Sequence, residues 1–454
     1  MSLSDLPKFV TMYLSSFFDI KSNAIFSLTN KKYYNAFSHM RELFKFIKQN
    51  YSTKYYHLTI SSIIKDSQDR SESILLVVVQ KNKLISTDLI NYLIENKSDL
   101  NLRNKFGNIP LHLACENKNA SLEIVRCLVE NKSDLNLQNK YENTPLHFAT
   151  LNKNIEIIDY LIENKSQLNL RENYRNTPLH LAFIDENISH EIIKTLVFNK
   201  SDLNLKGEKG NIPLHLAINH ENISIEIIKL LVENKSDLNL KEKRGNTSLQ
   251  MAINNPKISF EIIQFLVENK SDLNVRDKQG NTALFVEINK KDISFKTIKL
   301  FIENISDLNT RDRLGNTPLH LAINNNISLN LIQSLIINKS DLNLQDREGN
   351  SPLHLICKSG DISVQIIQHL IENKSDLNIK DNKDQNPLHY ALNNPNVSSE
   401  TIKNLFYFNS DLKPKEKKVE PINNDVLPEK ENKDFTEIEK NSQKMKNNEK
   451  CSLF

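Results

Sequence analysis

Glycine is scarce in this sequence. It accounts for 8 of 454 residues, less than 2 % where an ordinary protein has roughly 7 %. Loops that cradle phosphate groups need several glycines close together, so that the backbone can approach the ligand. Neither a GxxxxGK nor a GxGxxG stretch can be written anywhere in the chain. Nucleotide sites of these two kinds are therefore excluded.

Cysteine and long apolar runs are scarce as well. The four cysteines, at positions 115, 127, 357 and 451, form no CxxC pair, so we expect neither a disulfide framework nor a zinc site. The small number of cysteines and their lack of pairing fit a reducing compartment, and we expect the protein to be cytoplasmic. No apolar run approaches the length of a membrane span, and the N-terminus lacks the pattern of a signal peptide. The net charge of +3 gives no reason to expect nucleic acid as a partner.

The chain does contain a repeat of 33 to 35 residues. Each copy has a block such as Gly-Asn-Thr-Pro-Leu-His-Leu-Ala (315–322), then an apolar segment of helical period, then Asn-Lys-Ser-Asp-Leu-Asn-Leu. This pattern resembles the ankyrin repeat, and ten copies span residues 72–412. Each repeat is named here by its anchor leucine. The anchors are Leu76, Leu111, Leu146, Leu179, Leu214, Leu249, Leu284, Leu319, Leu353 and Leu388.

The repeat predicts an all-α solenoid of helix pairs joined by short, β-hairpin-like fingers. Asn or Thr before Pro provides an N-cap with Pro at the first helical position. The second helix, for example residues 225–233, has apolar residues on one stripe that only a neighbouring repeat can bury. Six glycines precede the first helix, where a tight turn needs positive φ. They are Gly107, Gly210, Gly245, Gly280, Gly315 and Gly349.

The repeats of this sequence differ from the usual ankyrin repeat in two respects. Most copies carry two extra residues between their helices, whereas the Leu146 repeat does not. After the second helix the family has a left-handed glycine, and here an Asn-Lys pair such as Asn234-Lys235 replaces it. Asn tolerates that conformation better than other non-glycine residues. We therefore expect the left-handed position to shift to the asparagine, at a cost below about 1 kcal/mol per repeat.

Seven histidines occupy one position of the repeat, one residue after the anchor. A metal cluster is the alternative to a structural role, but stacked helices stand about 8–10 Å apart, too far for shared ligands with bonds near 2 Å. We expect each histidine to bond to its own turn, as in the family. The Leu249 and Leu284 repeats lack the histidine and contain Gln250, Phe285 and Glu287, so we predict that their junction is the weakest in the stack.

The fingers between repeats are the expected partner-binding surface, because proteins that resemble this one bind partners there and on the inner helices. Their tips hold 16 basic and 8 acidic residues, which predicts a protein partner with an acidic patch. Candidate contact residues are Phe106, Tyr141, Tyr174, Lys209 and Arg244, at one tip position of five successive fingers. The alternative is that the charged tip residues are simply solvated and that the aromatic rings pack on each other, with no role in binding. The tips are residues 103–106, 138–141, 171–174, 206–209, 241–244, 276–279, 311–314, 345–348 and 380–383.

Residues 1–50 are predicted to form a separate helical module, followed by a linker at 51–71. An amphipathic helix opens the chain, and the order Leu6-Pro7, Tyr13-Leu14 and later residues resembles an F-box. The resemblance implies docking on the adaptor subunit of a cullin-type ubiquitin ligase. The alternative is a helical cap over the first repeat. The expected adaptor-binding residues are Leu6, Pro7, Phe9, Val10, Leu14 and Phe17.

Residues 413–454 are predicted to be a disordered, charged tail. The chain ends in Cys451-Ser452-Leu453-Phe454, which resembles a CaaX prenylation signal. Nearby lysines would add attraction to an anionic membrane. The alternative is that Cys451 carries no modification and lies in a disordered C-terminus.

The sequence as a whole predicts a non-catalytic binding protein. No paired carboxylates, nucleophile and base, or metal-ligand spacing stand out from the repeat, and we expect no cofactor. One hypothesis is a substrate-recognition subunit of a ubiquitin ligase, in which the repeats capture the substrate. The other is a membrane-tethered scaffold unrelated to ubiquitin.

Overall fold

The computed structural model describes residue 79 and residues 87–95, 98–118, 120–184, 189–222, 224–304, 306–338, 340–359 and 364–408. The predictions for the F-box-like segment, the linker and the CaaX-like end lie outside these residues. The chain divides into two units between Ile402 and Lys403. The second unit is described only at residues 403–408, so the following account concerns the first.

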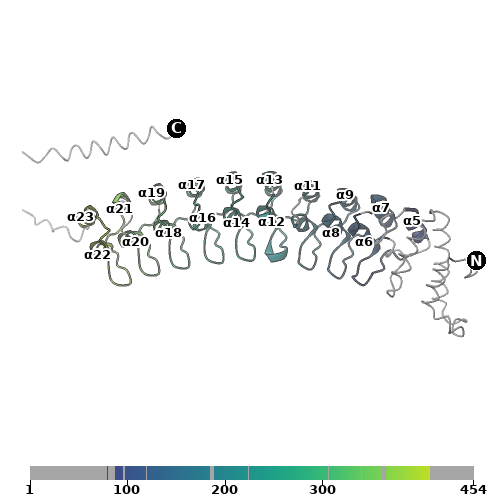
Figure 1. The fold of residues 1–454 in the computed structure, drawn as a ribbon, viewed down its shortest axis with the longest axis horizontal. Helices are drawn as coiled ribbons and strands as arrows, with labels where there is room; N and C mark the ends of the chain where they lie inside the picture. The colour runs from purple at the N-terminus through teal and green to yellow at the C-terminus, as the bar shows by residue number, and fades with distance from the viewer. Residues whose placement is uncertain are drawn as a thin grey trace, which may run out of the picture. The chain divides into compact units, whose positions relative to one another are not determined.

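The described residues form 19 α-helices and no strand, arranged in an outer and an inner row with fingers beyond the inner row (Figure 1). This confirms the predicted all-α solenoid. The outer helices are α5 (Thr87–Glu95), α7 (Leu122–Glu130), α9 (Ile155–Glu163), α11 (His190–Phe198), α13 (Ile225–Glu233), α15 (Phe260–Glu268), α17 (Phe295–Glu303), α19 (Leu329–Ile337), α21 (Val364–Glu372) and α23 (Ser399–Phe408). The inner helices are α6 (Pro110–Glu116), α8 (Pro145–Leu151), α10 (Pro178–Leu181), α12 (Pro213–Asn219), α14 (Ser248–Asn254), α16 (Ala283–Ile288), α18 (Pro318–Asn324), α20 (Pro352–Ser359) and α22 (Pro387–Asn393).

The core lies between the two rows. Anchor leucines such as Leu146 and Leu214 are fully buried on the inner helices. On the outer helix α13, Ile227, Ile228 and Leu231 are buried too, which is the stripe that the sequence predicted. Because helices of four to ten residues are too short to be stable alone, the stack depends on this burial between neighbours.

The turns after the outer helices α7, α9, α11, α13, α15 and α21 differ from the expectation. Lysine takes the left-handed conformation, with φ of 73° at Lys235, while Asn234 stays at φ −88°. The predicted shift to asparagine was therefore wrong. The asparagine caps the helix with its side chain instead: Asn234 Nδ2 donates to the carbonyl of Leu230 at 2.8 Å. This bond satisfies a carbonyl that the helix end leaves without an intrahelical partner.

The rest of the Asn-Lys-Ser-Asp-Leu-Asn-Leu segment joins neighbouring repeats. Asp237 Oδ1 accepts a bond from the backbone N–H of Asn239, which closes a local turn. The side chain of Asn204, one repeat earlier, accepts from the backbone N–H of Asp237 at 2.7 Å. The same inter-repeat bond links Asn239 to Asp272 at 2.8 Å. Asparagine in this segment thus adds a hydrogen-bonded ladder along the stack.

Candidate functional site

Each finger is a closed loop held by its own backbone. We number the four tip residues of each finger as positions one to four, so that residues 241–244 are positions one to four of their finger. The backbone N–H of the residue at position two donates to the carbonyl of the residue four further along the chain, for example from Glu242 to Asn246 at 3.0 Å. The residue after the tip has positive φ in all nine fingers, and the six glycines predicted there are confirmed at φ between 72° and 93°. The other three fingers place Glu142, Arg175 and Asp384 in this conformation.

The acidic residues of the fingers are largely turned inward. Six fingers carry an acid in the second position, and its carboxylate accepts from the backbone N–H groups two and four residues on. For Asp312 these donors are Leu314 and Asn316, both at 2.8 Å. Burial would raise the pKa of Asp381, but hydrogen bonds from Tyr390 and two backbone N–H groups lower it to about 2. The six acids are Glu172, Glu242, Asp277, Asp312, Asp346 and Asp381.

Basic residues in the first finger position also have structural partners. Lys206 Nζ donates to the carbonyl of Lys241 at 2.8 Å, and Arg276 Nη1 donates to that of Arg311 at 3.1 Å. These bonds tie each finger to the next one. Part of the positive charge counted in the sequence therefore serves the stack, and the charge available to a partner lies mainly in the third and fourth positions.

The five predicted contact residues all lie exposed at the fourth finger position. Phe106, Tyr141 and Tyr174 are 40, 52 and 67 % exposed. In the described part of the chain, ring contacts join His112 to Phe148 and His354 to Tyr390, and none joins these three aromatics. The rings therefore do not pack on each other, contrary to the alternative interpretation. Lys209 and Arg244 follow in the next two fingers.

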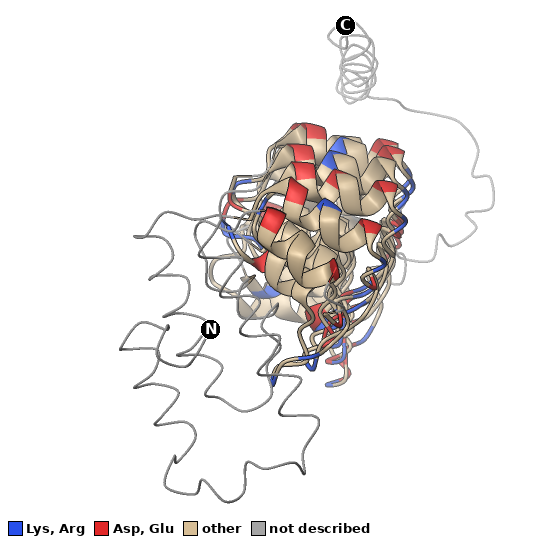
Figure 2. Ribbon diagram, turned by 90° about the vertical axis from the view of Figure 1, so that its right-hand side faces the viewer, with Lys and Arg blue, Asp and Glu red and all other residues tan. Residues whose placement is uncertain are grey.

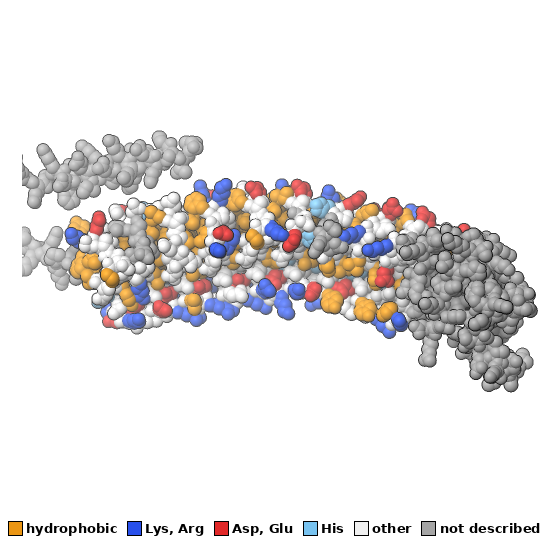
Figure 3. Space-filling view, viewed as in Figure 1, with side chains coloured by type: hydrophobic (Ala, Val, Ile, Leu, Met, Phe, Trp, Pro, Cys, Tyr) orange, Lys and Arg blue, Asp and Glu red, His pale blue; other side chains and the backbone are white. Residues whose placement is uncertain are grey.

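We call these five residues the finger strip. Figure 3 shows Lys and Arg side chains along the edge where the fingers lie, with hydrophobic side chains near the end that holds α6 and α8. Figure 2, which views the stack at 90° to this, shows acidic residues on the outer helices and basic residues at finger ends. Leu314 occupies the same register and is 61 % exposed. Sequence reasoning missed it, although its position in the repeat marks it.

The buried histidines have the structural role that the sequence predicted, and a second one. His147 Nδ1 accepts from the backbone N–H of Thr144 in its own turn at 3.1 Å. Its Nε2 also bonds the carbonyl of Asn176 in the next repeat at 3.3 Å. Burial lowers the pKa of this histidine to about 4. In the described residues no group of three His, Cys, Asp or Glu side chains could hold a metal ion.

The Leu249 and Leu284 repeats, which lack the histidine, differ from each other. Gln250 makes the same two kinds of hydrogen bond as the histidine. Its Oε1 accepts from the backbone N–H of Thr247, and its Nε2 donates to the carbonyl of Asn281 in the next repeat at 2.9 Å. Phe285 is buried and has no polar atom in its side chain with which to bridge. Glu287 stands where seven other repeats have Ala. It is buried, but its carboxylate accepts from the backbone N–H of Ser294 at 2.7 Å and pairs with Lys290.

Comparison with known proteins agrees with this geometry. A family model described as ankyrin repeats (3 copies) matches residues 75–172, 118–206, 179–277, 257–329 and 324–416. A comparison with curated proteins finds no match. In the described residues, no helix has both the length and the apolar character needed to span a bilayer.

Proposed function

Because the chain belongs to the ankyrin repeat family, whose repeats indicate a role in protein–protein interaction, we propose that its finger strip captures an acidic protein partner. The observation that carries this proposal is the separation of charge within the fingers. Six of the eight tip acids are bonded to their own backbone, as Asp312 is, whereas Lys209 and Arg244 are exposed beside a run of exposed aromatics. One of the two remaining acids, Glu208, forms an exposed ion pair with Lys209 at 3.9 Å. Aromatic and basic residues of this kind are the ones that dominate binding energy at interfaces.

We propose further that the captured protein is a substrate for ubiquitin transfer. The support is the resemblance of residues 1–50 to an F-box, including Leu6, Pro7 and Leu14. In this role the N-terminal segment binds the adaptor subunit of a cullin-type ligase in the cytosol, and the repeats hold the substrate. The protein itself supplies binding and positioning, and the ligase supplies the chemistry.

The experiment for this role is a pull-down with the full chain against the purified adaptor and cullin. We expect wild type to retain both and Leu14→Asp to lose both, because an acid would disrupt the apolar stripe of the helix that the sequence predicts there. Lys209→Glu is the matched control, since it alters the finger strip and should leave adaptor binding unchanged. Wild type that retains neither subunit would reject the ubiquitin role and leave the finger strip proposal untouched.

A membrane-tethered scaffold is the second candidate, favoured by the CaaX-like end. A prenyl group on Cys451 together with upstream lysines would give the two signals that stable membrane attachment requires. The test is the partition of the full chain between membrane and cytosol in cells. We expect Cys451→Ser to move the protein to the cytosol, while Ser452→Ala, which keeps the signal, should not. Equal partition of wild type and Cys451→Ser would exclude this candidate.

A further inference from the structure

Neighbouring fingers are joined by a backbone hydrogen bond at six of their eight junctions. At each of these, the carbonyl of position four accepts from the backbone N–H of position three in the next finger. Lys140 donates in this way to Phe106 at 3.0 Å, and Lys243 donates to Lys209 at 2.9 Å. The other four donors are Asn173, Lys278, Arg347 and Asn382. These bonds fix each finger tip relative to the next one, in the row of fingers that Figure 1 shows.

Two junctions lack this bond, and they divide the nine fingers, all of which the structure describes, into three blocks of three. One lies between the third and fourth fingers, where the N–H of Glu208 donates to the side chain of Asn176 at 3.0 Å and not to the carbonyl of Tyr174. The other lies between the sixth and seventh fingers. The boundary between the first two blocks falls inside the finger strip. The first block holds fingers 103–106, 138–141 and 171–174, and the second holds fingers 206–209, 241–244 and 276–279.

This boundary has a local cause in the fourth finger. Position two of that finger is Gly207, where every other finger has Asn, Asp or Glu. A Cβ atom on Gly207 would lie 2.5 Å from Asn176 Oδ1 and 2.6 Å from the ring of His180, so a larger residue does not fit. The tip forms a short 3-10 helix, η3 (Glu208–Gly210), with Lys209 at φ 57°. No backbone bond therefore sets the distance between the aromatic and the basic parts of the finger strip.

The tips of the first two blocks differ in chemistry. Position four of the first block is aromatic in all three fingers, and each ring is exposed. Positions three and four of the second block hold one acid, Glu208, and four exposed basic residues, which are Lys209, Lys243, Arg244 and Lys278. Glu208 forms an ion pair with Lys209 at 3.9 Å, and in the described part of the chain the other three basic residues form none. A partner thus meets apolar rings on the first block and excess positive charge on the second.

The spacing of the fingers determines which partner segment can match them. Each finger contributes two chain segments, which are bonded to each other, as Glu242 is to Asn246, and to the next finger by the bonds described above. Hydrogen-bonded extended segments lie about 4.8 Å apart, so the fingers repeat about every 10 Å. This agrees with the packing distance of stacked helices, about 8–10 Å. Because an extended chain rises about 3.3 Å per residue, three residues of an extended segment span one finger.

We infer that the finger strip binds an extended segment of its acidic partner. Three apolar side chains of the segment, spaced by three residues, lie on the aromatic rings of the first block, and two carboxylates, also three residues apart, lie on Lys209 and Arg244. Aromatic rings and arginine are the residues that contribute most to binding at interfaces. The inference rests on the protein-binding role proposed above and adds the form and the spacing of what is bound. The interval between the third apolar side chain and the first carboxylate is a variable of the test, because no backbone bond sets the distance between the blocks.

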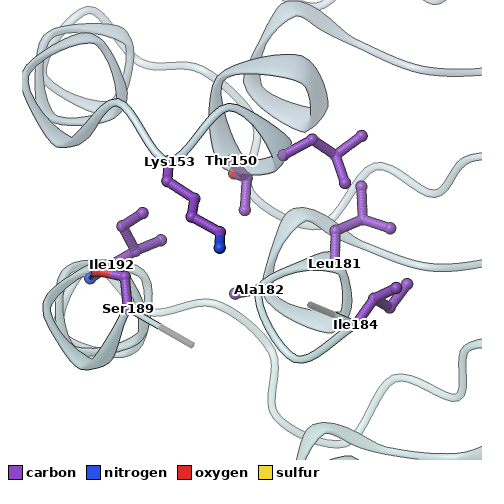
Figure 4. Close-up of a pocket in the computed structure, with 8 residues that line it drawn as sticks. Thr150, Lys153, Leu181, Ala182, Ile184, Ser189 and Ile192 are labelled. Atoms are coloured by element: carbon purple, nitrogen blue, oxygen red, sulfur yellow. Dashed lines mark hydrogen bonds between the residues drawn. The ribbon is translucent and has the colours of Figure 1, made fainter. Parts of the chain in front are cut away.

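A second exposed apolar surface in the same part of the stack provides a control. A pocket of about 180 Å³ lies beside the ends of the inner helices α8 and α10, and Leu151 and Ile184 are among the residues that line it (Figure 4). These two side chains are 48 and 58 % exposed, close to the values of 52 and 67 % for Tyr141 and Tyr174. The fingers precede the first residue of each inner helix. A segment bound along the finger tips should therefore not depend on this pocket.

The test measures the binding of fluorescein-labelled peptides to the full chain by fluorescence anisotropy. Each peptide has blocked ends, three leucines spaced by three residues, two aspartates spaced by three residues, and serine and glycine elsewhere. The interval between the leucines and the aspartates is three, four or five residues, and each peptide is also made in the reverse order. Control peptides have the same composition with a spacing of two. We expect the best peptide to bind at least about tenfold more tightly than any control, because a control cannot place all its side chains on the tips at once.

One pair of variants tests the apolar contacts. Tyr141→Ser/Tyr174→Ser should weaken binding of the best peptide at least about fivefold, because it removes two rings of the first block. Leu151→Ser/Ile184→Ser is the matched control. It removes two exposed apolar side chains from the pocket and should leave binding of the peptide unchanged.

A second pair of variants tests the charged contacts. Wild type should prefer the aspartate peptide to its asparagine analogue by about fivefold, as expected for two exposed ion pairs. Arg244→Gln should reduce this preference. Lys383→Gln makes the same change of charge at position four of the last finger, where the lysine is also exposed, and should leave the preference unchanged.

Three results would overturn the inference: no binding of any peptide, equal binding of the test and control peptides, or binding that survives Tyr141→Ser/Tyr174→Ser. The proposed function can fail separately, because it is tested by charge reversal in the finger strip against the partner protein. If Lys209→Glu/Arg244→Glu weakened binding of the partner while no peptide bound, the finger strip would recognise a folded surface and only the present inference would fall.

Discussion

Six of the seven histidines that follow an anchor leucine are buried, and burial disfavours the charged form of their rings. Burial lowers the pKa of His112, His147, His180 and His215 to about 4, from 6.5 in an unfolded chain. Between these two values the unfolded chain binds more protons than the folded one. The free energy of unfolding should therefore decrease as the pH falls from 6.5 toward 4.

This prediction is checked by urea unfolding followed by circular dichroism at several pH values in that window. His147→Gln is the matched variant, because Gln250 makes the same bonds without a titratable ring. The variant should show a smaller loss of stability with acid than wild type. A pH slope that the substitution leaves unchanged would mean that the histidines do not cause it.

The serine of the Asn-Lys-Ser-Asp segment is buried and its hydroxyl bonds to no group, for example at Ser236. Because a buried hydroxyl without a partner costs free energy, Ser236→Ala should raise the free energy of unfolding by about 1 kcal/mol. Ser351→Ala is the matched control, since the Ser351 hydroxyl lies 2.8 Å from His354 Nδ1. It should lower stability by a similar amount. Thermal unfolding of both variants decides the matter, and a loss of stability in Ser236→Ala would contradict the prediction.

At the scale of elements, the lysine that follows the C-cap of an outer helix has a left-handed backbone conformation, which costs free energy for any residue with a Cβ atom. Lys235 has φ 73°, where a Cβ atom is crowded. Lys235→Gly should therefore raise the free energy of unfolding by roughly 0.5–1 kcal/mol, after the greater freedom of glycine in the unfolded chain is subtracted. Asn234→Ala should lower it, because the helix end loses its side-chain cap. A neutral or destabilising Lys235→Gly, measured by chemical denaturation, would show that the turn is not strained.

Sequence reasoning predicted the helices well because their signals are local. Proline at the first helical position marked the start of inner helices such as α12, and the apolar stripe marked the outer helix 225–233, which has the bounds of α13. It failed at the Asn-Lys turn, where the side chain of Asn234 bonds the helix and the lysine turns left-handed. It also missed the second bond of histidines such as His147, and the bridge of Gln250. Those bonds depend on where the next repeat places its carbonyl, which no local pattern contains.

At the scale of the whole stack, the fingers at the junction between the Leu284 and Leu319 repeats are packed less closely than those at the junctions on either side. Gln250 bridges the junction before it, but Phe285 cannot bridge this one. A Cβ placed on Gly280 would lie 3.9 Å from the backbone nitrogen of Arg313, whereas at Gly245 and Gly349 the matching distances are 2.7 and 2.6 Å. The fingers are thus further apart here. The weakness that the sequence indicated near Leu249 and Leu284 is expected one junction later.

Hydrogen exchange monitored by mass spectrometry tests this expectation. Amides in α16, α18 and the fingers beside them should exchange faster than those of α12 and α14, because local opening follows the weakest contacts. Phe285→His, which restores the residue found in most repeats, should slow exchange at this junction. Uniform protection along the stack would contradict the expectation.

The finger strip is the central claim, and charge reversal on its exposed lysine and arginine tests it most directly. Binding of the partner protein to the full chain is measured for wild type, for Lys209→Glu/Arg244→Glu, and for Lys194→Glu/Lys296→Glu. The last pair makes the same change of charge on the outer helices α11 and α17, where both lysines are exposed. We expect at least about a tenfold loss of affinity for the finger variant and no change for the outer-helix variant. Equal affinity of all three proteins would contradict it.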